Sequence, residues 1–168
     1  MKNLKTLLLI AVFTLGVAGI ANAQKVGHID FEKLVAEMPQ TKALKLDIEK
    51  LGKTYQDEIK GMAKKLDAKR KKYIAESEAQ TKDTNDQRAL ELQKEGATYE
   101  KTRQFAYQDM QKQQNEKLSP IIEKAEKAVQ AVAATKGLLY IMDSSKGKGL
   151  LVSKGEDIFN AVKAKLGF

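Results

Sequence analysis

Apolar residues recur at coiled-coil spacing from Thr41 to Ala134, with one polar break at Thr81–Asp86. This spacing places the apolar side chains on one stripe of a helix, and a polar break between two such stretches indicates a turn. Strand-like segments border the stretch at both ends. The pattern therefore predicts an α+β fold in which a long antiparallel helical hairpin stands on a small β-stranded body.

The first helix of the hairpin carries an eleven-residue repeat. Leu44, Tyr55 and Leu66 occupy successive equivalent positions, and the stripe is completed by Ile48, Leu51, Ile59, Met62 and Tyr73. This period gives about 3.67 residues per turn, which is close to the relaxed α-helix and slightly right-handed in supercoil. The stripe fades after Tyr73, and two glycines within the helix weaken it further. We expect a marginal, bendable arm.

The returning helix is predicted from about Gln87 to Thr135, with Gly137 as the glycine that ends it. Its N-terminal cap is expected among Asp83, Thr84 and Asn85, because short polar residues favour caps. The predicted seam is polar and includes Gln104, Gln108, Gln111 and Asn115. Pro120 is expected to kink this helix or to begin a new segment.

The body is predicted to comprise residues 24–40 and 118–168, and the arm residues 41–117. It begins with a strand at 25–30 and a short helix, Phe31 to Met38, capped by Asp30. The apolar run Leu138–Met142 predicts a buried strand, and Leu150–Val152 its hairpin partner. A last amphipathic helix has an inner face of Ile158, Phe159, Val162 and Leu166.

A body of this size rarely obtains more than about 3–5 kcal/mol from its own core. Short strands also leave edges that another subunit can cover. We therefore expect the strands to combine across chains in an oligomer. The residues expected in the core of the body and its oligomer are Val26, Ile29, Leu139, Ile141 and Leu151.

Residues 1–23 have the pattern of a signal peptide. A basic start at 1–5 is followed by an apolar run at 7–20 and by Ala21-Asn22-Ala23, a small-residue cleavage site. The apolar run is short for a membrane span, although an uncleaved anchor is the alternative reading. The sequence contains no cysteine, so it offers neither a lipid-acylation site nor a disulfide. A soluble mature protein beginning at Gln24 is predicted outside the cytoplasm.

Basic residues exceed acidic ones, with 30 Lys and Arg against 22 Asp and Glu. The excess favours acidic partners such as anionic lipid or acidic polypeptide, while nucleic acid is not expected for an exported protein. Seven cations gather midway along the first arm helix, and we call them the basic belt: Lys60, Lys64, Lys65, Lys69, Arg70, Lys71 and Lys72. The belt is either a solvated helix face or a surface that attracts acidic clients.

No combination of residues predicts an enzyme. His28 is the only histidine and there is no cysteine, so neither a multi-histidine metal site nor a Cys–His pair can form. Lys146-Gly147-Lys148-Gly149 lacks the spacing of a phosphate loop and suits a turn better. We therefore predict no catalytic residue, no metal and no cofactor.

Two local segments and their order along the chain resemble the Skp (OmpH-like) family of periplasmic outer-membrane-protein chaperones. They are the opening Lys25-Val26-Gly27-His28-Ile29-Asp30-Phe31-Glu32-Lys33-Leu34-Val35 and the closing Leu138-Leu139-Tyr140-Ile141-Met142-Asp143, with Asp157-Ile158 before the last helix. The resemblance implies a homotrimer whose bodies form a β-barrel-like hub. It also implies that the helical arms enclose a cavity that holds unfolded outer-membrane proteins without ATP.

The sequence departs from that family at two points. Phe159 stands where the family usually has threonine, and the positive charge lies mid-arm rather than toward the tips. The resemblance favours an ATP-independent holdase with unfolded outer-membrane proteins as partners. Two alternatives remain: a structural or tethering coiled-coil protein of the envelope, and a protein that binds lipopolysaccharide, anionic membrane or another anionic polymer.

Overall fold

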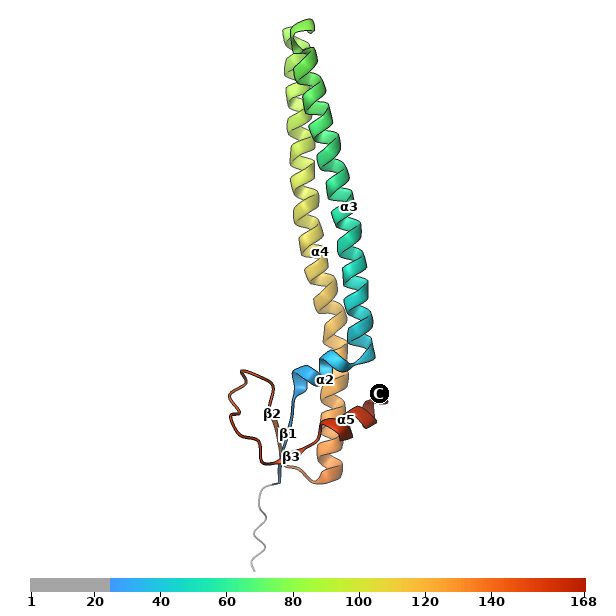
Figure 1. Ribbon diagram of the computed structural model, residues 1–168, viewed down its shortest axis with the longest axis vertical. Coiled ribbons are helices and arrows are strands. Elements are labelled where there is room, and N and C mark those ends of the chain that lie inside the picture. The colour runs from blue at the N-terminus through green and yellow to red at the C-terminus, as the bar shows by residue number, and fades with distance from the viewer. Residues whose placement is uncertain (1–24) are drawn as a thin grey trace, which may run out of the picture.

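The computed structural model describes residues 25–168, so the predicted signal peptide lies outside the described residues. Two long helices, α3 (Pro39–Glu76) and α4 (Lys82–Lys136), run side by side and antiparallel, joined at the tip by the short 3-10 helix η1 (Ser77–Ala79). They extend far beyond a small body with a three-stranded sheet (Figure 1). The predicted α+β fold with a dominant helical hairpin is confirmed.

The start of α4 is set by Thr81 rather than by any of the three predicted caps. Thr81 Oγ1 accepts a hydrogen bond from the Thr84 N–H at 3.2 Å, the usual N-cap geometry. The helix consequently begins at Lys82, before the expected Gln87. Asp83, Thr84 and Asn85 lie inside its first turn, so their prediction as caps was wrong.

The other end of α4 agrees with the prediction. Gly137 has φ 63°, a left-handed conformation that would be strained in a residue with a side chain. Its N–H donates to the carbonyls of Ala133 and Ala134 and so ends the helix. Pro120 does not begin a new segment, because α4 continues through it without a break. The helix therefore carries the end of the arm directly into the body.

The buried stripe of α4 differs from the predicted one. Gln104, Gln108, Gln111 and Asn115 are all exposed, so their assignment to the seam was wrong. Most of the less exposed residues of α4 along the arm follow two series with seven-residue steps: Arg88, Glu95, Thr102 and Asp109, and Leu92, Tyr99, Ala106 and Gln113. The first series is wholly polar, so a search for apolar periodicity cannot detect it.

The sheet is parallel, with the first strand in the centre. β1 (Val26–Ile29) pairs with β2 (Tyr140–Asp143) on one side and with β3 (Glu156–Asp157) on the other. The predicted hairpin between Leu138–Met142 and Leu150–Val152 was therefore wrong. The second segment lies in the loop between β2 and β3, where the Leu151 side chain is 96% exposed.

Two glycines allow β3 to approach β1. A Cβ on Gly155 would lie 2.6 Å from the Val26 carbonyl oxygen, and a Cβ on Gly27 would lie 3.1 Å from that of Glu156. The first distance is too short for any side chain and the second is tight, and both involve backbone that cannot move aside easily. The close pairing of these strands therefore requires glycine at 155 and favours it at 27.

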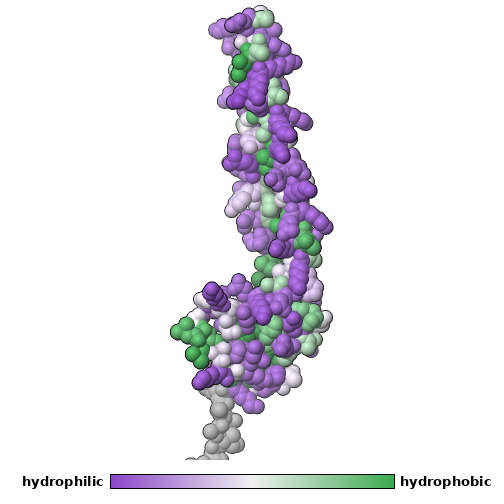
Figure 2. Space-filling view, viewed as in Figure 1, coloured by the Kyte–Doolittle hydropathy of each residue, from purple (hydrophilic) through white to green (hydrophobic). Residues whose placement is uncertain are grey.

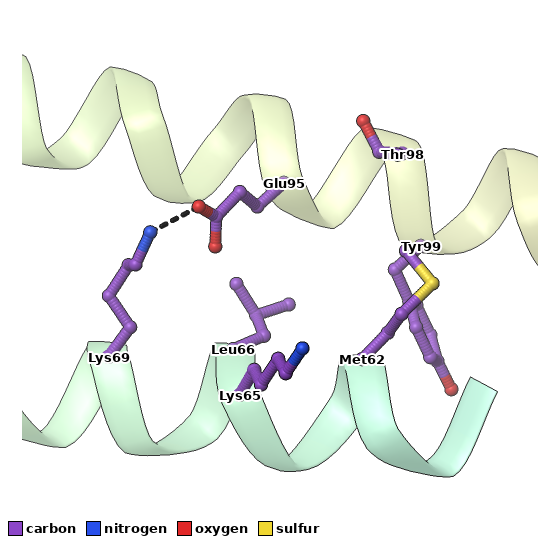
Figure 3. A pocket seen from close by; sticks show the side chains of 7 residues that line it. All are labelled: Met62, Lys65, Leu66, Lys69, Glu95, Thr98 and Tyr99. Atoms are coloured by element: carbon purple, nitrogen blue, oxygen red, sulfur yellow. Dashed lines mark hydrogen bonds and ion pairs between the residues drawn. The ribbon is translucent and has the colours of Figure 1, made fainter. Parts of the chain in front are cut away.

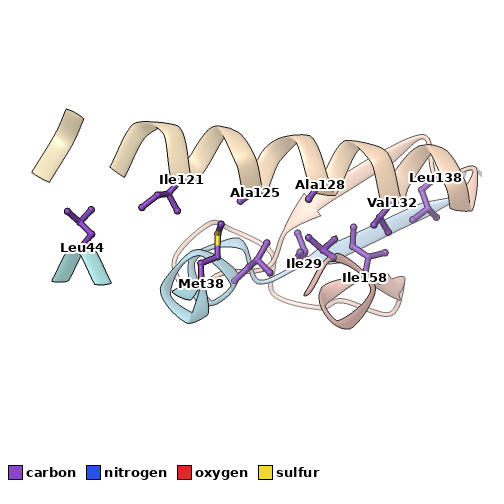
Figure 4. Close-up of a cluster of buried hydrophobic side chains, with 11 residues drawn as sticks. Ile29, Met38, Leu44, Ile121, Ala125, Ala128, Val132, Leu138 and Ile158 are labelled. Atoms are coloured by element: carbon purple, nitrogen blue, oxygen red, sulfur yellow. The ribbon is translucent and has the colours of Figure 1, made fainter. Parts of the chain in front are cut away.

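The core of the body lies between the sheet, the lower half of α4 and two short helices, α2 (Phe31–Glu37) and α5 (Phe159–Leu166). In Figure 4, one side of α4 carries Ile121, Ala125, Ala128 and Val132 toward Met38, Ile29 and Ile158. The other members of this buried cluster are Leu34, Leu44, Leu138 and Val162. The small alanines of α4 let the neighbouring elements approach closely, and the cluster joins both ends of the chain.

A polar link fixes the sheet to α2. Asp143 Oδ1, at the end of β2, accepts from the Phe31 N–H at 3.3 Å and from the Ser145 N–H at 2.9 Å. Ser145 is buried, and its Oγ contacts Asp143 at 2.5 Å and accepts from the Glu32 N–H at 3.0 Å. Asp30 caps α2 through the Lys33 N–H, as the sequence predicts.

Replacing Asp143 with asparagine is expected to lower the free energy of unfolding by about 1–2 kcal/mol at neutral pH. Burial works to raise the pKa of Asp143, but hydrogen bonds from Ser145 and Phe31 outweigh it and hold the pKa below its usual 3.8. The stabilisation is thus present above pH 3.8 and is lost as the pH falls through the lower folded-state value. Urea unfolding at several pH values measures this, and an unchanged pH profile in the variant would contradict it.

Candidate functional site

Two surfaces have side chains that the chain itself does not cover: the basic belt on α3 and one face of the sheet. In the belt, Lys60, Lys64 and Lys65 are exposed and have no ion-pair partner among residues 25–168. Arg70 and Lys71 share Asp67, at 3.2 and 2.7 Å, and Lys72 lies 4.0 Å from Glu76. These pairs lie within α3, so their charges stay at the surface.

Lys69 differs from the rest of the belt because it points across the seam. Its Nζ lies 2.8 Å from Glu91 and also contacts Glu95, both on α4. Hydrogen bonds with these two carboxylates raise the pKa of Lys69 above its usual value. The hydrogen bonds from Lys69 and Tyr73 lower the pKa of Glu91. Lys69 thus links the two helices, while the other belt residues remain available at the surface.

The seam beside the belt is hollowed. A cavity of about 410 Å³ opens between the helices, and in Figure 3 Met62, Leu66 and Tyr99 form its apolar wall with Lys65 and Lys69 at the edge. A second cavity of about 340 Å³ also has Leu66 and Tyr99 in its wall. The seam is consequently loosely packed where the positive charge is greatest.

Large apolar side chains are also exposed along the arm. They are Leu46 and Ile74 on α3 and Leu90, Phe105 and Tyr107 on α4. Phe105 lies edge-on against Tyr55 at 6.4 Å between ring centroids, and the Tyr55 hydroxyl donates to Asp109 at 2.9 Å. Separated apolar side chains among charged ones make a surface suited to weak contacts with a varied chain.

The sheet has one covered face and one open face. Ile29 is buried and Ile141 is half-buried, and both pack against the core. The opposite face presents Val26, Tyr140 and Met142, which are 37%, 57% and 47% exposed. Parallel register places Val26 beside Tyr140 and His28 beside Met142, so these side chains form one continuous patch.

The loop between β2 and β3 extends the exposed apolar surface of the body. Leu139, just before β2, is 67% exposed, and Leu151 and Val152 in the loop are 96% and 67% exposed. Figure 2 shows an apolar projection on the side of the body where Figure 1 draws this loop. Of the five residues expected in the core of the body and its oligomer, only Ile29 is fully buried within one chain.

Neither surface contains a recognisable metal-binding group. Among residues 25–168 there is no group of three or more histidine, aspartate or glutamate side chains placed to hold a metal ion. In the same range, no helix combines the length and the apolar character needed to cross a membrane. The chemistry that these surfaces offer is charge and exposed apolar area.

Comparison with known proteins identifies the same architecture elsewhere. Residues 25–166 match the sequence model of the OmpH family, described as outer membrane protein (OmpH-like). The fold is similar to the crystal structure of a candidate outer membrane chaperone (OmpH-like) from Caulobacter crescentus CB15. The TM-score is 0.75 and the identity 19%, over 84% of this chain and 83% of that one. At this identity the likeness concerns the fold. No curated protein matches the sequence.

Proposed function

The chain belongs to the OmpH-like family, and from this premise we propose that it is a chaperone that holds unfolded outer-membrane proteins in the periplasm. Holding needs no ATP, cofactor or catalytic residue, because it requires only that the client bind more strongly than it aggregates. The family supports the chaperone role in general. The clients, the compartment and the mechanism of holding are our proposal.

The observation that carries the proposal is the arm. Two antiparallel helices stand clear of the body and carry exposed apolar side chains among an excess of lysines. No other part of residues 25–168 packs against this surface and covers it. It suits a client that is extended, apolar and variable in sequence, since many weak contacts can each be replaced by another.

We further propose that three copies associate through their bodies. Val26, Tyr140, Met142 and the loop around Leu151 expose apolar area on one side of the body. β2 and β3 are both edge strands, so each has an unpaired edge that a neighbouring copy could extend. Three arms projecting from such a hub would enclose a cavity, whereas a single arm encloses nothing.

Aggregation of an unfolded β-barrel membrane protein, followed by light scattering after dilution from urea, tests the holding function. Suppression is expected at about one oligomer per client. A protein that only tethers the envelope would leave the scattering unchanged. A protein that binds lipopolysaccharide or anionic membrane would bind vesicles containing those lipids, lose them at high salt and fail to suppress aggregation.

Charge reversal in the belt tests how clients are captured. Four of the exposed belt residues that do not bridge the helices are each changed to glutamate: Lys60, Lys64, Lys65 and Lys72. We expect client association to slow about tenfold or more at low salt, and the difference from wild type to shrink as salt rises. Stopped-flow fluorescence of a labelled client at two salt concentrations measures both effects.

A matched control reverses four exposed lysines away from the belt: Lys42, Lys117, Lys124 and Lys127. The total charge then changes equally, so a similar slowing in both variants would indicate net charge rather than the belt. Equal association rates for wild type and the belt variant at low salt would leave the belt as a solvated helix face. Lys69 is kept unchanged because it contacts α4.

A further inference from the structure

The contacts between α3 and α4 change in character along the arm. Near the body they are apolar, with Leu44, Ile48 and Leu118 at or beside the core. At mid-arm Leu66 and Tyr99 both line two cavities. Farther out, ionic and polar side chains connect the helices. A seam held by ion pairs is weakened by added salt, whereas a seam held by apolar burial is not.

Six residues make these outer connections, and we call them the clasp: Lys69, Tyr73 and Glu76 on α3, and Arg88, Glu91 and Glu95 on α4. Lys69 binds both Glu91 and Glu95, and the Tyr73 hydroxyl donates to Glu91 at 2.6 Å. Arg88 donates to Glu76 at 2.7 Å, and its guanidinium lies 4.5 Å from the centre of the Tyr73 ring. Each residue of the clasp contacts at least one partner on the opposite helix.

The clasp holds the outer arm only weakly. Its carboxylates are 39–46% exposed, so water and salt screen their attraction to Lys69 and Arg88. Nη1 of Arg88 is buried and has no hydrogen-bond partner within residues 25–168, which disfavours the closed arrangement. Without the clasp the two outer helical segments would be nearly independent, and isolated helices of this length are marginal in water.

We propose that the arm beyond Leu66 and Tyr99 is a separate, salt-sensitive unit that opens reversibly while the inner arm and body stay closed. In the closed state, the clasp aligns the two helices and stiffens the tip. In the open state, the outer segments of α3 and α4 separate from each other, although the turn still joins them, and their backbone amides lose protection from hydrogen exchange. The fraction of time spent open is set by the strength of the clasp, and therefore by the ionic strength around the arm.

The biological role of this opening rests on the proposed function, because an adjustable arm end would let one cavity accept clients of different bulk. The test of the opening itself does not depend on the proposed function. Opening is a property of the protein without a client, so a failure to suppress aggregation and a failure to open are separate results.

Hydrogen–deuterium exchange of the whole protein tests the clasp. The variant carries Glu91→Gln and Glu95→Gln, which keep the side-chain shape and remove the charges that hold Lys69. The control carries Asp67→Asn and Glu100→Gln, which remove two charges from ion pairs that lie within one helix. The total charge of the two variants is equal, and only the first weakens the connection between α3 and α4.

We expect amides at 70–90 to exchange about fivefold faster in the clasp variant than in wild type at low salt. Those at 121–132 should be unchanged, and the control should behave as wild type. Raising the salt concentration should speed exchange at 70–90 in wild type and have less effect in the clasp variant. Equal outer exchange in wild type and the clasp variant would overturn the proposal, as would equal acceleration in the control or the same acceleration throughout the arm.

Discussion

Replacing Tyr140 and Met142 with aspartate is expected to leave the chain folded and to abolish its association. Both side chains are about half exposed on the open face of the sheet, so a carboxylate there stays hydrated in a single chain. In an oligomer assembled through that face the same carboxylates would be buried without partners, at a cost of several kcal/mol each. Native mass spectrometry of the variant should show monomers with the circular dichroism spectrum of a helical protein.

The control for this variant carries Phe105→Asp and Tyr107→Asp, which place the same charges at exposed aromatic positions on the arm. It should keep the oligomeric state of the wild type. An intact oligomer for the sheet variant would mean that the open face is not the interface. Loss of the helical spectrum would mean that Tyr140 and Met142 support the fold of each chain, contrary to their exposure.

Shortening the arm is expected to remove client holding and to leave the body intact. Tyr55–Asp109, Lys69–Glu95 and Glu76–Arg88 share one antiparallel register, so segments 55–76 and 88–109 face each other and have equal length. Deleting both while keeping the native turn at 77–87 shortens the arm by about 33 Å at 1.5 Å per residue. The buried cluster lies outside the deleted segments.

We expect the shortened protein to keep its oligomeric state by native mass spectrometry and to suppress client aggregation at least tenfold less well at equal concentration. The large effect follows from the loss of most of the exposed arm surface, including the belt. If the shortened protein became monomeric, the arms rather than the bodies would hold the oligomer together. If it suppressed aggregation as well as wild type, the body would be the client-binding part.

The sequence predicts the hairpin well because long apolar periodicity and the glycine that ends a helix are local signals. Leu44, Tyr55 and Leu66 identify the buried side of α3 by spacing alone, and Gly137 identifies its partner's end. The partner stripe on α4 was missed because Glu95, Thr102 and Asp109 are polar. Glu95 pairs with Lys69 and Asp109 pairs with Tyr55 across the seam, which leaves these carboxylates only partly exposed, and only the register of the hairpin reveals that pairing.

The body was harder to predict because an apolar segment does not reveal whether its own chain or another subunit buries it. Leu150-Leu151-Val152 has the composition of a buried strand, yet Leu151 is almost fully exposed in one chain. The strand that completes the sheet, Glu156–Asp157, is short and charged, and it pairs because Gly155 and Gly27 permit close approach. The belt was predicted as one surface, and the exception of Lys69 depends on carboxylates more than twenty residues away.

The central place of β1 in the sheet imposes an order on folding. Val26–Ile29 has neighbours only from 140–143 and 156–157, so the sheet cannot form until nearly the whole chain is present. The hairpin of α3 and α4 needs contacts much closer in sequence and can form earlier. If the chain is exported from its N-terminus, as we propose, its arm can form before its hub, and the arm, by closing, carries the last strands back to the first. If subunits join through the sheet, as we propose, they can recognise only chains that have arrived complete.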